Sequence, residues 1–256
     1  KGVEWVLVTE SRQASAPSAH SESMSRSITL YKQTLGYVHS FMDGFRAGEA
    51  ISYEASEPFV GQAVDYSLRG DRLGSIAKLK RYDEYTYSHC LNVCIFAVIF
   101  ARHLGLPPET MKLIGAAGLF HDAGKARVPL EILNKPGKHD AFESYIMRNH
   151  AQMGYDLLCQ IAGVPQPVRL AALEHHERYA GHGYPGGKKG ADLGLVSSII
   201  CICDVYDAMT ANRVYQKARS PHEVLSRMYG WRGKEFDPGL VEKFIRCMGI
   251  YPEGMV

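Results

Sequence analysis

The segment HDAGK, residues 121–125, places a histidine beside an aspartate at the end of an apolar stretch with helical periodicity. Adjacent side chains on a regular helix point about 100° apart, so His121 and Asp122 can face one object only where the helix ends. A metal ion is one such object, although an isolated His-Asp pair is more often a surface or capping pair. Further ligands are needed to favour a metal site.

Other candidate ligands occur in the same part of the chain. Asp204 follows the apolar run SSIICIC, where an unpaired buried carboxylate would cost several kcal/mol. Each candidate alone fits a hydrogen-bonded core or capping residue, but the whole set favours a metal centre. The accompanying histidines, all within or at the ends of helix-like segments, are His89, His150, His175 and His176.

The mixture of imidazole and carboxylate ligands suits manganese, iron or zinc, and a carboxylate can bridge two ions. Five histidines and two aspartates are too many ligands for one tetrahedral zinc. Two six-coordinate ions completed by water fit that number better.

Helices are expected to position these residues. Asp140 and Glu143 resemble a capping box, Gly124 is placed to end a helix, and the glycine-rich stretch 177–194 is expected to be an ordered loop. The apolar spacing predicts helices at 28–45 and, after a join near 48–58, at 59–73. It further predicts helices from Asp83 or Thr86 to Gly105, from Pro107 to HDAGK, from Asp140 towards His150, at 168–175, at 193–211 and within 220–251.

Three regions are expected along the chain. Residues 1–27 are predicted to hold the end of an N-terminal module, with a short strand at 1–10, followed by a flexible serine-rich linker at 11–27. Residues 28–75 are predicted to form a pair of connecting helices, whose expected role is packing or dimerisation. Residues 76–256 are predicted to form an all-α domain.

Composition excludes some function classes. The formal net charge is +2, from 29 basic and 27 acidic residues, so no strong global charge favours a nucleic acid polymer or an anionic membrane. The longest apolar stretches, 93–101 and 193–203, are shorter than the roughly 20 residues that span a bilayer, and no membrane anchor or signal peptide is expected. The six cysteines include no CxxC pair and are expected to be buried thiols in a reducing cytoplasm.

Six segments resemble the HD-GYP domain, the bacterial branch of the HD phosphohydrolase superfamily. The similarity covers residues 85–217, and the order and spacing of the segments match. The resemblance implies an all-α HD-type helical bundle. The segments are YTYSH (85–89), HDAGK (121–125), ILNKPG (132–137), NHAQMG (149–154), HHERYAGHGYPGG (175–187) and DVYDAMTANRVYQKA (204–218).

The resemblance also implies how the ligands are shared between two divalent metals, with iron or manganese favoured. Some family members have a glutamate one turn before the first histidine, linked to a third metal, but this position is Tyr85 here, which favours two metals. Asp122 is expected to bridge. The first metal would be held by His89, His121, Asp122 and Asp204, and the second by His150, His175 and His176.

Members of the family hydrolyse cyclic di-GMP, and some act on cyclic GMP-AMP, which implies a product that is a linear dinucleotide or a mononucleotide. Lys125 and Asp122 are the expected catalytic residues, although Lys125 also fits a cation that stabilises a helix C-terminus. The expected substrate-binding residues are Lys125, Gly183, Tyr184, Pro185 and Arg213.

Two departures from the family pattern keep an alternative open. Ala180 replaces the usual aspartate of the glycine-rich loop, and Gln216 replaces a basic residue after Arg213. These changes fit a non-catalytic module that binds a cyclic dinucleotide or a partner protein. A mononucleotide phosphohydrolase and a di-iron oxygenase are further alternatives, against which the intact Gly183-Tyr184-Pro185 argues. A homodimer and signalling-protein partners are also expected.

Overall fold

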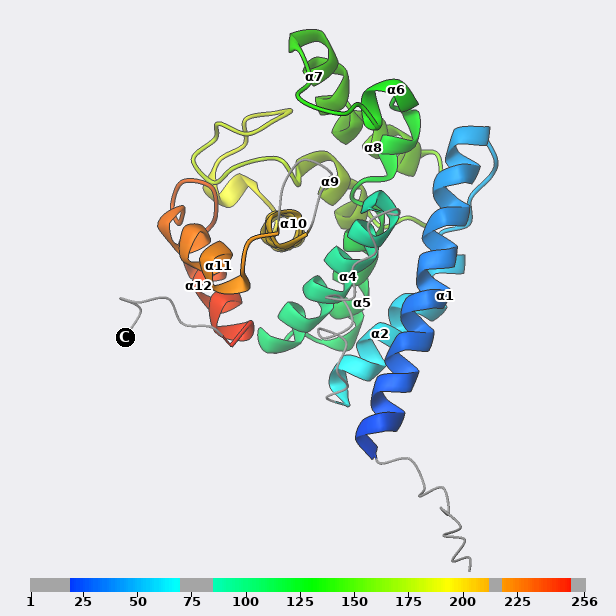
Figure 1. Ribbon diagram of the computed structural model, residues 1–256, viewed down its shortest axis with the longest axis vertical. Helices are drawn as coiled ribbons and strands as arrows, with labels where there is room; N and C mark the ends of the chain where they lie inside the picture. Colours follow the sequence, from blue (N-terminus) through cyan, green and yellow to red (C-terminus); the bar gives the residue numbers. More distant parts are fainter. Residues whose placement is uncertain (1–18, 70–84, 212–217, 250–256) are drawn as a thin grey trace, which may run out of the picture.

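The computed structural model describes residues 19–69, 85–211 and 218–249, and within these ranges it contains helices and loops but no strand. The prediction of an all-α fold is therefore confirmed. Figure 1 shows the arrangement. The α-helices are α1 (Ala19–Ala47), α2 (Glu57–Leu68), α4 (Tyr85–His103), α5 (Pro108–Phe120), α6 (Leu130–Leu133), α7 (Ala141–Arg148), α8 (His150–Cys159), α9 (Gln166–Glu174), α10 (Leu195–Thr210), α11 (Pro221–Gly230) and α12 (Pro238–Cys247). The described ranges also contain the 3-10 turns η1 (Glu54–Ser56), η3 (Ala123–Arg127) and η4 (Gly190–Asp192).

Local sequence signals explain where several helices begin. The Asp140 side chain accepts from the backbone of Glu143, whose side chain accepts in return from the backbone of Asp140, so the predicted capping box opens α7. Ser220 and Asp237 cap α11 and α12, each of which has proline at its start. These caps satisfy backbone donors that have no partner inside the helix.

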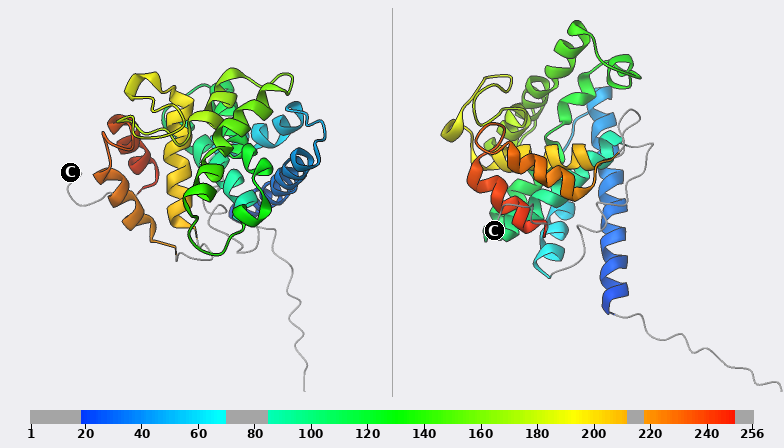
Figure 2. Two further views of the ribbon diagram at one scale, coloured as in Figure 1. Left: turned by 90° about the horizontal axis from the view of Figure 1, so that it is seen from above. Right: turned by 60° about the vertical axis from the view of Figure 1, so that its left-hand side comes forward.

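The centre of the molecule is built on α4 and α5, against which α9 and α10 pack (Figure 1). Phe96 of α4 meets Tyr206 of α10 edge to face, with ring centroids 5.1 Å apart. In the two turned views of Figure 2, α1 and α2 lie along one side of this centre. Phe41 of α1 lies 5.0 Å from Phe120 of α5, between ring centroids. The connecting helices and the following bundle thus share one hydrophobic core.

The predicted linker at 11–27 is wrong for its second half, because α1 begins at Ala19 and continues unbroken to Ala47. Ser27 is buried and Leu30 lies in the shared core, so the packed part of α1 provides a nucleus for helix extension. Once a helix is nucleated, each added residue gains a hydrogen bond at little further cost, and the alanine and glutamate of this segment favour helix. The strand predicted at 1–10 and the rest of the linker up to residue 18 lie outside the described residues.

The predicted role of Gly124 as a helix stop is also wrong. Helix α5 ends at Phe120, and Gly124 lies inside η3 without a positive φ. A Cβ on Gly124 would lie 1.9 Å from the carbonyl oxygen of His150, so glycine is needed where the backbone of η3 touches α8.

No helix in the described ranges has both the length and the apolar composition needed to cross a membrane.

Candidate metal centre

The seven predicted ligands converge at one place in the bundle, and most come from helix ends. His121 and Asp122 lie between α5 and η3, and His150 is the first residue of α8. His175 and His176 follow the last residue of α9. His89 lies in the second turn of α4, and Asp204 lies inside α10. Six of these side chains are buried and His176 is partly buried.

Asp122 lies between two groups of histidines, and its two oxygens face different groups. Oδ2 lies 3.4 Å from Nε2 of His121 and 3.7 Å from Nε2 of His89. Oδ1 lies 3.3 Å from Nε2 of His150 and 3.7 Å from Nε2 of His175. Potential ligand atoms of His89, His121 and Asp122 all lie within 4.8 Å of one another. Asp122 is therefore in position to bind two cations, one through each oxygen.

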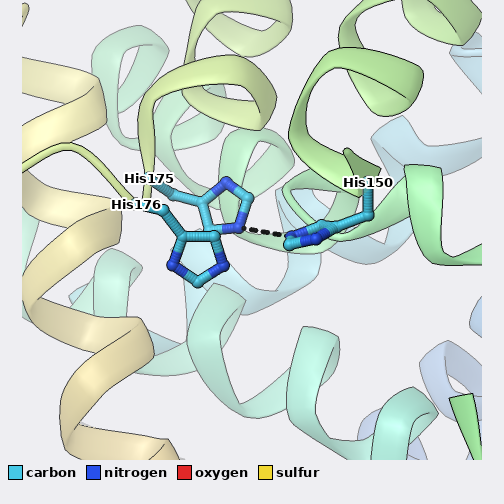
Figure 3. Close-up of side chains that lie close together, drawn as sticks. All are labelled: His150, His175 and His176. Carbon is cyan, nitrogen blue, oxygen red and sulfur yellow. Dashed lines mark hydrogen bonds between the residues drawn. The ribbon is translucent and has the colours of Figure 1, made fainter. Parts of the chain in front are cut away.

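The second group is the histidine trio of His150, His175 and His176, whose side chains lie close together in Figure 3. Nε2 of His150 lies 3.2 Å from Nε2 of His175. The rings of His175 and His176 are 4.1 Å apart between centroids, and one ligand atom from each member of the trio fits within 4.8 Å. Three imidazoles this close can share one metal ion.

The hydrogen bonds of the ring nitrogens fix the orientation and the tautomer of these imidazoles. Nδ1 of His121 lies 2.8 Å from the Gly118 carbonyl, and Nδ1 of His150 lies 2.5 Å from the Met147 carbonyl. Nδ1 of His175 likewise lies 3.0 Å from the Ala172 carbonyl. A carbonyl oxygen only accepts, so Nδ1 carries the hydrogen and the lone pair of Nε2 points towards Asp122.

This donor set fits a metal, because acceptor atoms face one another. Nε2 of His121 and Oδ1 of Asp122 are buried and, within the described ranges, have no hydrogen-bond partner. Such orphaned polar atoms cost free energy in a protein interior. A cation between the imidazoles and the carboxylate would satisfy both.

The electrostatics of the centre keep its carboxylates ionised. Burial alone would raise the pKa of the Asp122 carboxyl, but the charge of Lys125 and the neighbouring histidines lower that pKa well below its usual value. Burial would likewise raise the pKa of Asp204, but its hydrogen bond with His89 lowers that pKa well below its usual value. Burial lowers the pKa of His176 to about 3, which keeps this imidazole neutral. Ionised carboxylates and neutral imidazoles are the forms that bind metals.

A buried network behind His89 was not predicted from the sequence. His89 faces Asp204 through Nε2 at 3.0 Å, while its Nδ1 lies 2.8 Å from Oδ2 of Asp207. Asn92 donates to Oδ1 of Asp207 at 3.1 Å, and the Tyr31 hydroxyl donates to Oδ1 of Asn92 at 3.4 Å. The spacing of Asp204 and Asp207, three apart on one helix, is the sequence signal that could have indicated a second aspartate here.

Lys125, the other predicted catalytic residue, lies at the same site. Its Nζ is 2.5 Å from Oδ2 of Asp122. Burial alone would lower the pKa of the Lys125 amine, but the Asp122 charge raises it, so the amine is protonated. A fixed cation therefore lies beside the group of His89, His121 and Asp122.

The glycine-rich loop is held by two buried glutamates that sequence reasoning did not single out. Glu177 accepts hydrogen bonds from the backbone of Gly186 at 2.6 Å and of Lys188 at 3.1 Å. Glu174 pairs with the Lys188 amine at 2.6 Å. A Cβ on Gly183 would lie 2.5 Å from the backbone nitrogen of Arg178, so glycine is required for loop packing. Contact between Gly183 and the substrate stays a prediction.

Tyr184 connects this loop to the histidine trio. Its ring stacks on the ring of His176, with centroids 4.7 Å apart and planes 28° apart. Pro185, which follows a cis peptide bond, is exposed. Ala180 is exposed as well, and its backbone donates to the Lys234 carbonyl at 2.9 Å. Together with the ion pair of Arg178 and Glu235 at 3.2 Å, this bond ties the loop to the α11–α12 turn.

Three predicted features lie beyond what the structure describes. Arg213 and Gln216 fall between the described ranges, and nothing is described of the Tyr85 side chain. The predictions that depend on them, including the restriction to two metals, stay predictions.

Comparisons with known proteins show the family to which the chain belongs. The sequence profile of the HD domain family matches residues 77–240. A cyclic di-GMP phosphodiesterase from Pseudomonas aeruginosa is 38% identical over 234 residues, which is 91% of this chain and 56% of that protein. A cyclic di-GMP phosphodiesterase response regulator from Xanthomonas campestris is 36% identical over 67% of this chain and 47% of its own length. The chain thus spans about half the length of these relatives.

A third relative, a 3'3'-cGAMP-specific phosphodiesterase from Vibrio cholerae, is 34% identical over 61% of this chain and 30% of its own length. Among solved structures, an HDG"Y"P protein from Bdellovibrio bacteriovorus superimposes with a TM-score of 0.75. That match covers 91% of this chain and 75% of the other at 15% identity, so it supports the fold alone.

Proposed function

This chain belongs to the HD domain family, and from this premise we propose that it is a metal-dependent phosphodiesterase of the HD-GYP type that hydrolyses cyclic di-GMP. The observation that carries the proposal is the placement of Asp122, whose two oxygens face two separate groups of histidine Nε2 atoms. Such a centre suits phosphodiester hydrolysis, in which negative charge on the phosphate repels the attacking nucleophile. Cyclic GMP-AMP is the second substrate to be tested, because one relative is named for it.

The proposed metals are two divalent transition ions, iron or manganese, as the mixed imidazole and carboxylate ligands favour. His89, His121, Asp122 and Asp204 would hold one ion, and the trio of His150, His175 and His176 the other, with Asp122 shared. When bound, such a pair supplies an activated water and neutralises the charge of the phosphate oxygens.

The chain's own residues contribute charge and orientation. The Lys125 amine neutralises Oδ2 of Asp122. With a phosphodiester in place, the same amine is within reach to donate to a phosphate oxygen and to stabilise the charge that develops on it. Tyr184, packed on His176, offers an apolar face at the edge of the centre. Direct contacts with substrate by Gly183, Pro185 and Arg213 belong to this proposal.

The test is a product assay on protein loaded with iron or manganese, with cyclic di-GMP and cyclic GMP-AMP as substrates. We expect about two metal equivalents per chain and conversion to linear dinucleotide or mononucleotide. The double variant His121→Ala with Asp122→Ala should lose turnover while remaining folded. His103→Ala, an exposed histidine on α4, is the matched control and should behave as the unaltered chain.

Three results would overturn the proposal. Active protein without transition metal would exclude the metal role. Metal-loaded protein that leaves both dinucleotides intact would exclude the phosphodiesterase. Tight binding of a dinucleotide without turnover would instead identify the non-catalytic module that Ala180 and Gln216 leave open.

We also propose a cytoplasmic location, which the six free cysteines support, because such thiols persist in reducing compartments. A homodimer and signalling-protein partners stay predictions, and light scattering tests the first of them.

A further inference from the structure

The guanidinium of Arg148 lies over the ring of Tyr184, 5.5 Å from its centroid. Arg148 is the last residue of α7 and precedes His150 by two positions. Tyr184 also stacks on His176, so Arg148, Tyr184 and His176 form a connected series from the surface to the histidine trio. This places a cationic side chain at the edge of the candidate metal centre.

Arg148 has no acidic partner among the residues that the structure describes, and its side chain is exposed. The nearby Arg178 differs, because it pairs with Glu235 and donates to the His175 carbonyl at 3.2 Å. Arg178 is thus used within the loop, whereas no acidic side chain in the described ranges takes up the donors of Arg148. A planar guanidinium matches a phosphate with two parallel hydrogen bonds.

Among the described residues, Lys125 and Arg148 lie beside different halves of the centre. Lys125 contacts Oδ2 of Asp122, the oxygen that faces His89 and His121. Arg148 is connected instead to the trio, through Tyr184. A cyclic dinucleotide carries two phosphodiesters, of which one is cleaved at a time, so the other needs a separate cation.

We propose that Arg148 binds the second, non-scissile phosphate of the cyclic dinucleotide, with Tyr184 holding its guanidinium plane. This inference rests on the proposed function and deepens it by naming a substrate-binding residue. It accounts for a free cation at this edge, and it predicts that substrates with a single phosphodiester gain nothing from Arg148.

The test compares Arg148→Ala and Arg148→Lys with a matched control, Arg232→Ala. Arg232 makes the same kind of contact, with its guanidinium 4.0 Å from the Tyr229 ring centroid, but on the α11 side of the molecule. Metal-loaded proteins are assayed with cyclic di-GMP and with bis(p-nitrophenyl) phosphate, which has one phosphodiester. Metal content is measured for each variant, because Arg148 lies close to His150 in the chain.

Loss of a charged hydrogen-bond partner predicts a KM for cyclic di-GMP about 10- to 100-fold higher in Arg148→Ala, with a smaller rise in Arg148→Lys. The kcat for cyclic di-GMP and the hydrolysis of bis(p-nitrophenyl) phosphate should change less than about threefold. Arg232→Ala should match the unaltered chain. Binding of a hydrolysis-resistant phosphorothioate analogue of cyclic di-GMP, measured by calorimetry, should weaken by the same factor as the KM rises.

An unchanged KM and unchanged analogue binding in Arg148→Ala would overturn the inference while leaving the phosphodiesterase intact. An equal loss on both substrates would also overturn it, since that result indicates general damage to the centre. If the unaltered metal-loaded chain binds the analogue without hydrolysing cyclic di-GMP, the proposed function fails, and the calorimetric comparison still decides the role of Arg148. If the unaltered chain neither binds nor hydrolyses, both fail.

Discussion

Oδ2 of Asp207 lies 2.8 Å from Nδ1 of His89, and both side chains are buried. The carboxylate accepts the Nδ1 hydrogen and thereby turns Nε2 towards Asp204 and Asp122. Burial alone would lower the pKa of His89, but its bonds with Asp204 and Asp207 raise it to about 9, so this imidazole must release a proton when it binds a metal. A carboxylate behind an imidazole strengthens that imidazole as a metal ligand.

We expect Asp207→Asn to weaken metal binding by about 10- to 100-fold, because the amide keeps the size of the side chain but removes its charge. Competition with a chromogenic chelator measures this affinity, and circular dichroism checks the fold. Asp43→Asn, at a carboxylate that is 64% exposed and paired with Arg46, is the control and should retain full affinity. Equal affinities for all three proteins would contradict a positioning role for Asp207.

Gly124→Ala should destabilise the protein by about 1–3 kcal/mol or more, since the added Cβ overlaps the His150 carbonyl. Urea unfolding monitored by tryptophan fluorescence gives the change in the free energy of unfolding. At Gly61 in α2, a Cβ meets nothing within 4 Å, so Gly61→Ala should instead stabilise by up to about 1 kcal/mol. If both substitutions changed the free energy of unfolding in the same direction, the close contact between Gly124 and α8 would not be what excludes a larger side chain at position 124.

Glu177→Gln should loosen the glycine-rich loop. The amide has one acceptor oxygen for the two backbone donors of Gly186 and Lys188, and the loss of a charged acceptor costs about 1.5–3 kcal/mol. Hydrogen exchange of the 183–190 amides should accelerate by about 10- to 100-fold. Glu223→Gln, on the exposed face of α11, is the control, and loop exchange that is the same in both variants would exclude Glu177 as the anchor.

The capping box of α7 should respond to acid. A hydrogen bond from Lys135 lowers the pKa of the Glu143 carboxyl below its usual value. A carboxyl with a lowered folded-state pKa stabilises the fold above its unfolded-state pKa of about 4.3, and this contribution is lost as the pH falls through the folded-state value. The difference in stability between the unaltered chain and Glu143→Gln should therefore be present at pH 7 and vanish in strong acid.

Urea unfolding across this pH range measures the effect. Glu131→Gln on the neighbouring α6 serves as the control. A difference for Glu143→Gln that stays constant down to strong acid would rule out the proposed linkage.

Much of the fold was predictable because apolar spacing and capping residues are local signals. The spacing of Asp140 and Glu143 in the sequence predicts a capping box at the start of α7, and the structure has that capping box. The helical linker was missed because its order depends on α1 packing into the core through residues such as Leu30, which local composition does not reveal.

The convergence of the site was predictable for a different reason. His121 and Asp122 are adjacent at a helix end, and the other motifs follow in the order expected for the family. The helical bundle of that family therefore brings the ligands together. Asp207 and Glu177 were not assigned roles. The position of Asp207 one helical turn after Asp204 was a local signal for a second aspartate at the site. Nothing in the sequence around Glu177 shows that its carboxylate binds the backbone of a loop. Gly124 was misinterpreted because contact between two main chains has no sequence signature.

The hydrogen bonds from Tyr31 through Asn92 and Asp207 to His89 join α1 to the centre of the molecule. A rotation of α1 about its axis would withdraw the Tyr31 hydroxyl from Asn92 and alter the support of one ligand, without touching the glycine-rich loop. A rotation of this helix would therefore reach the ligand His89 through Asn92 and Asp207, and Lys125 through the packing of α1 on η3.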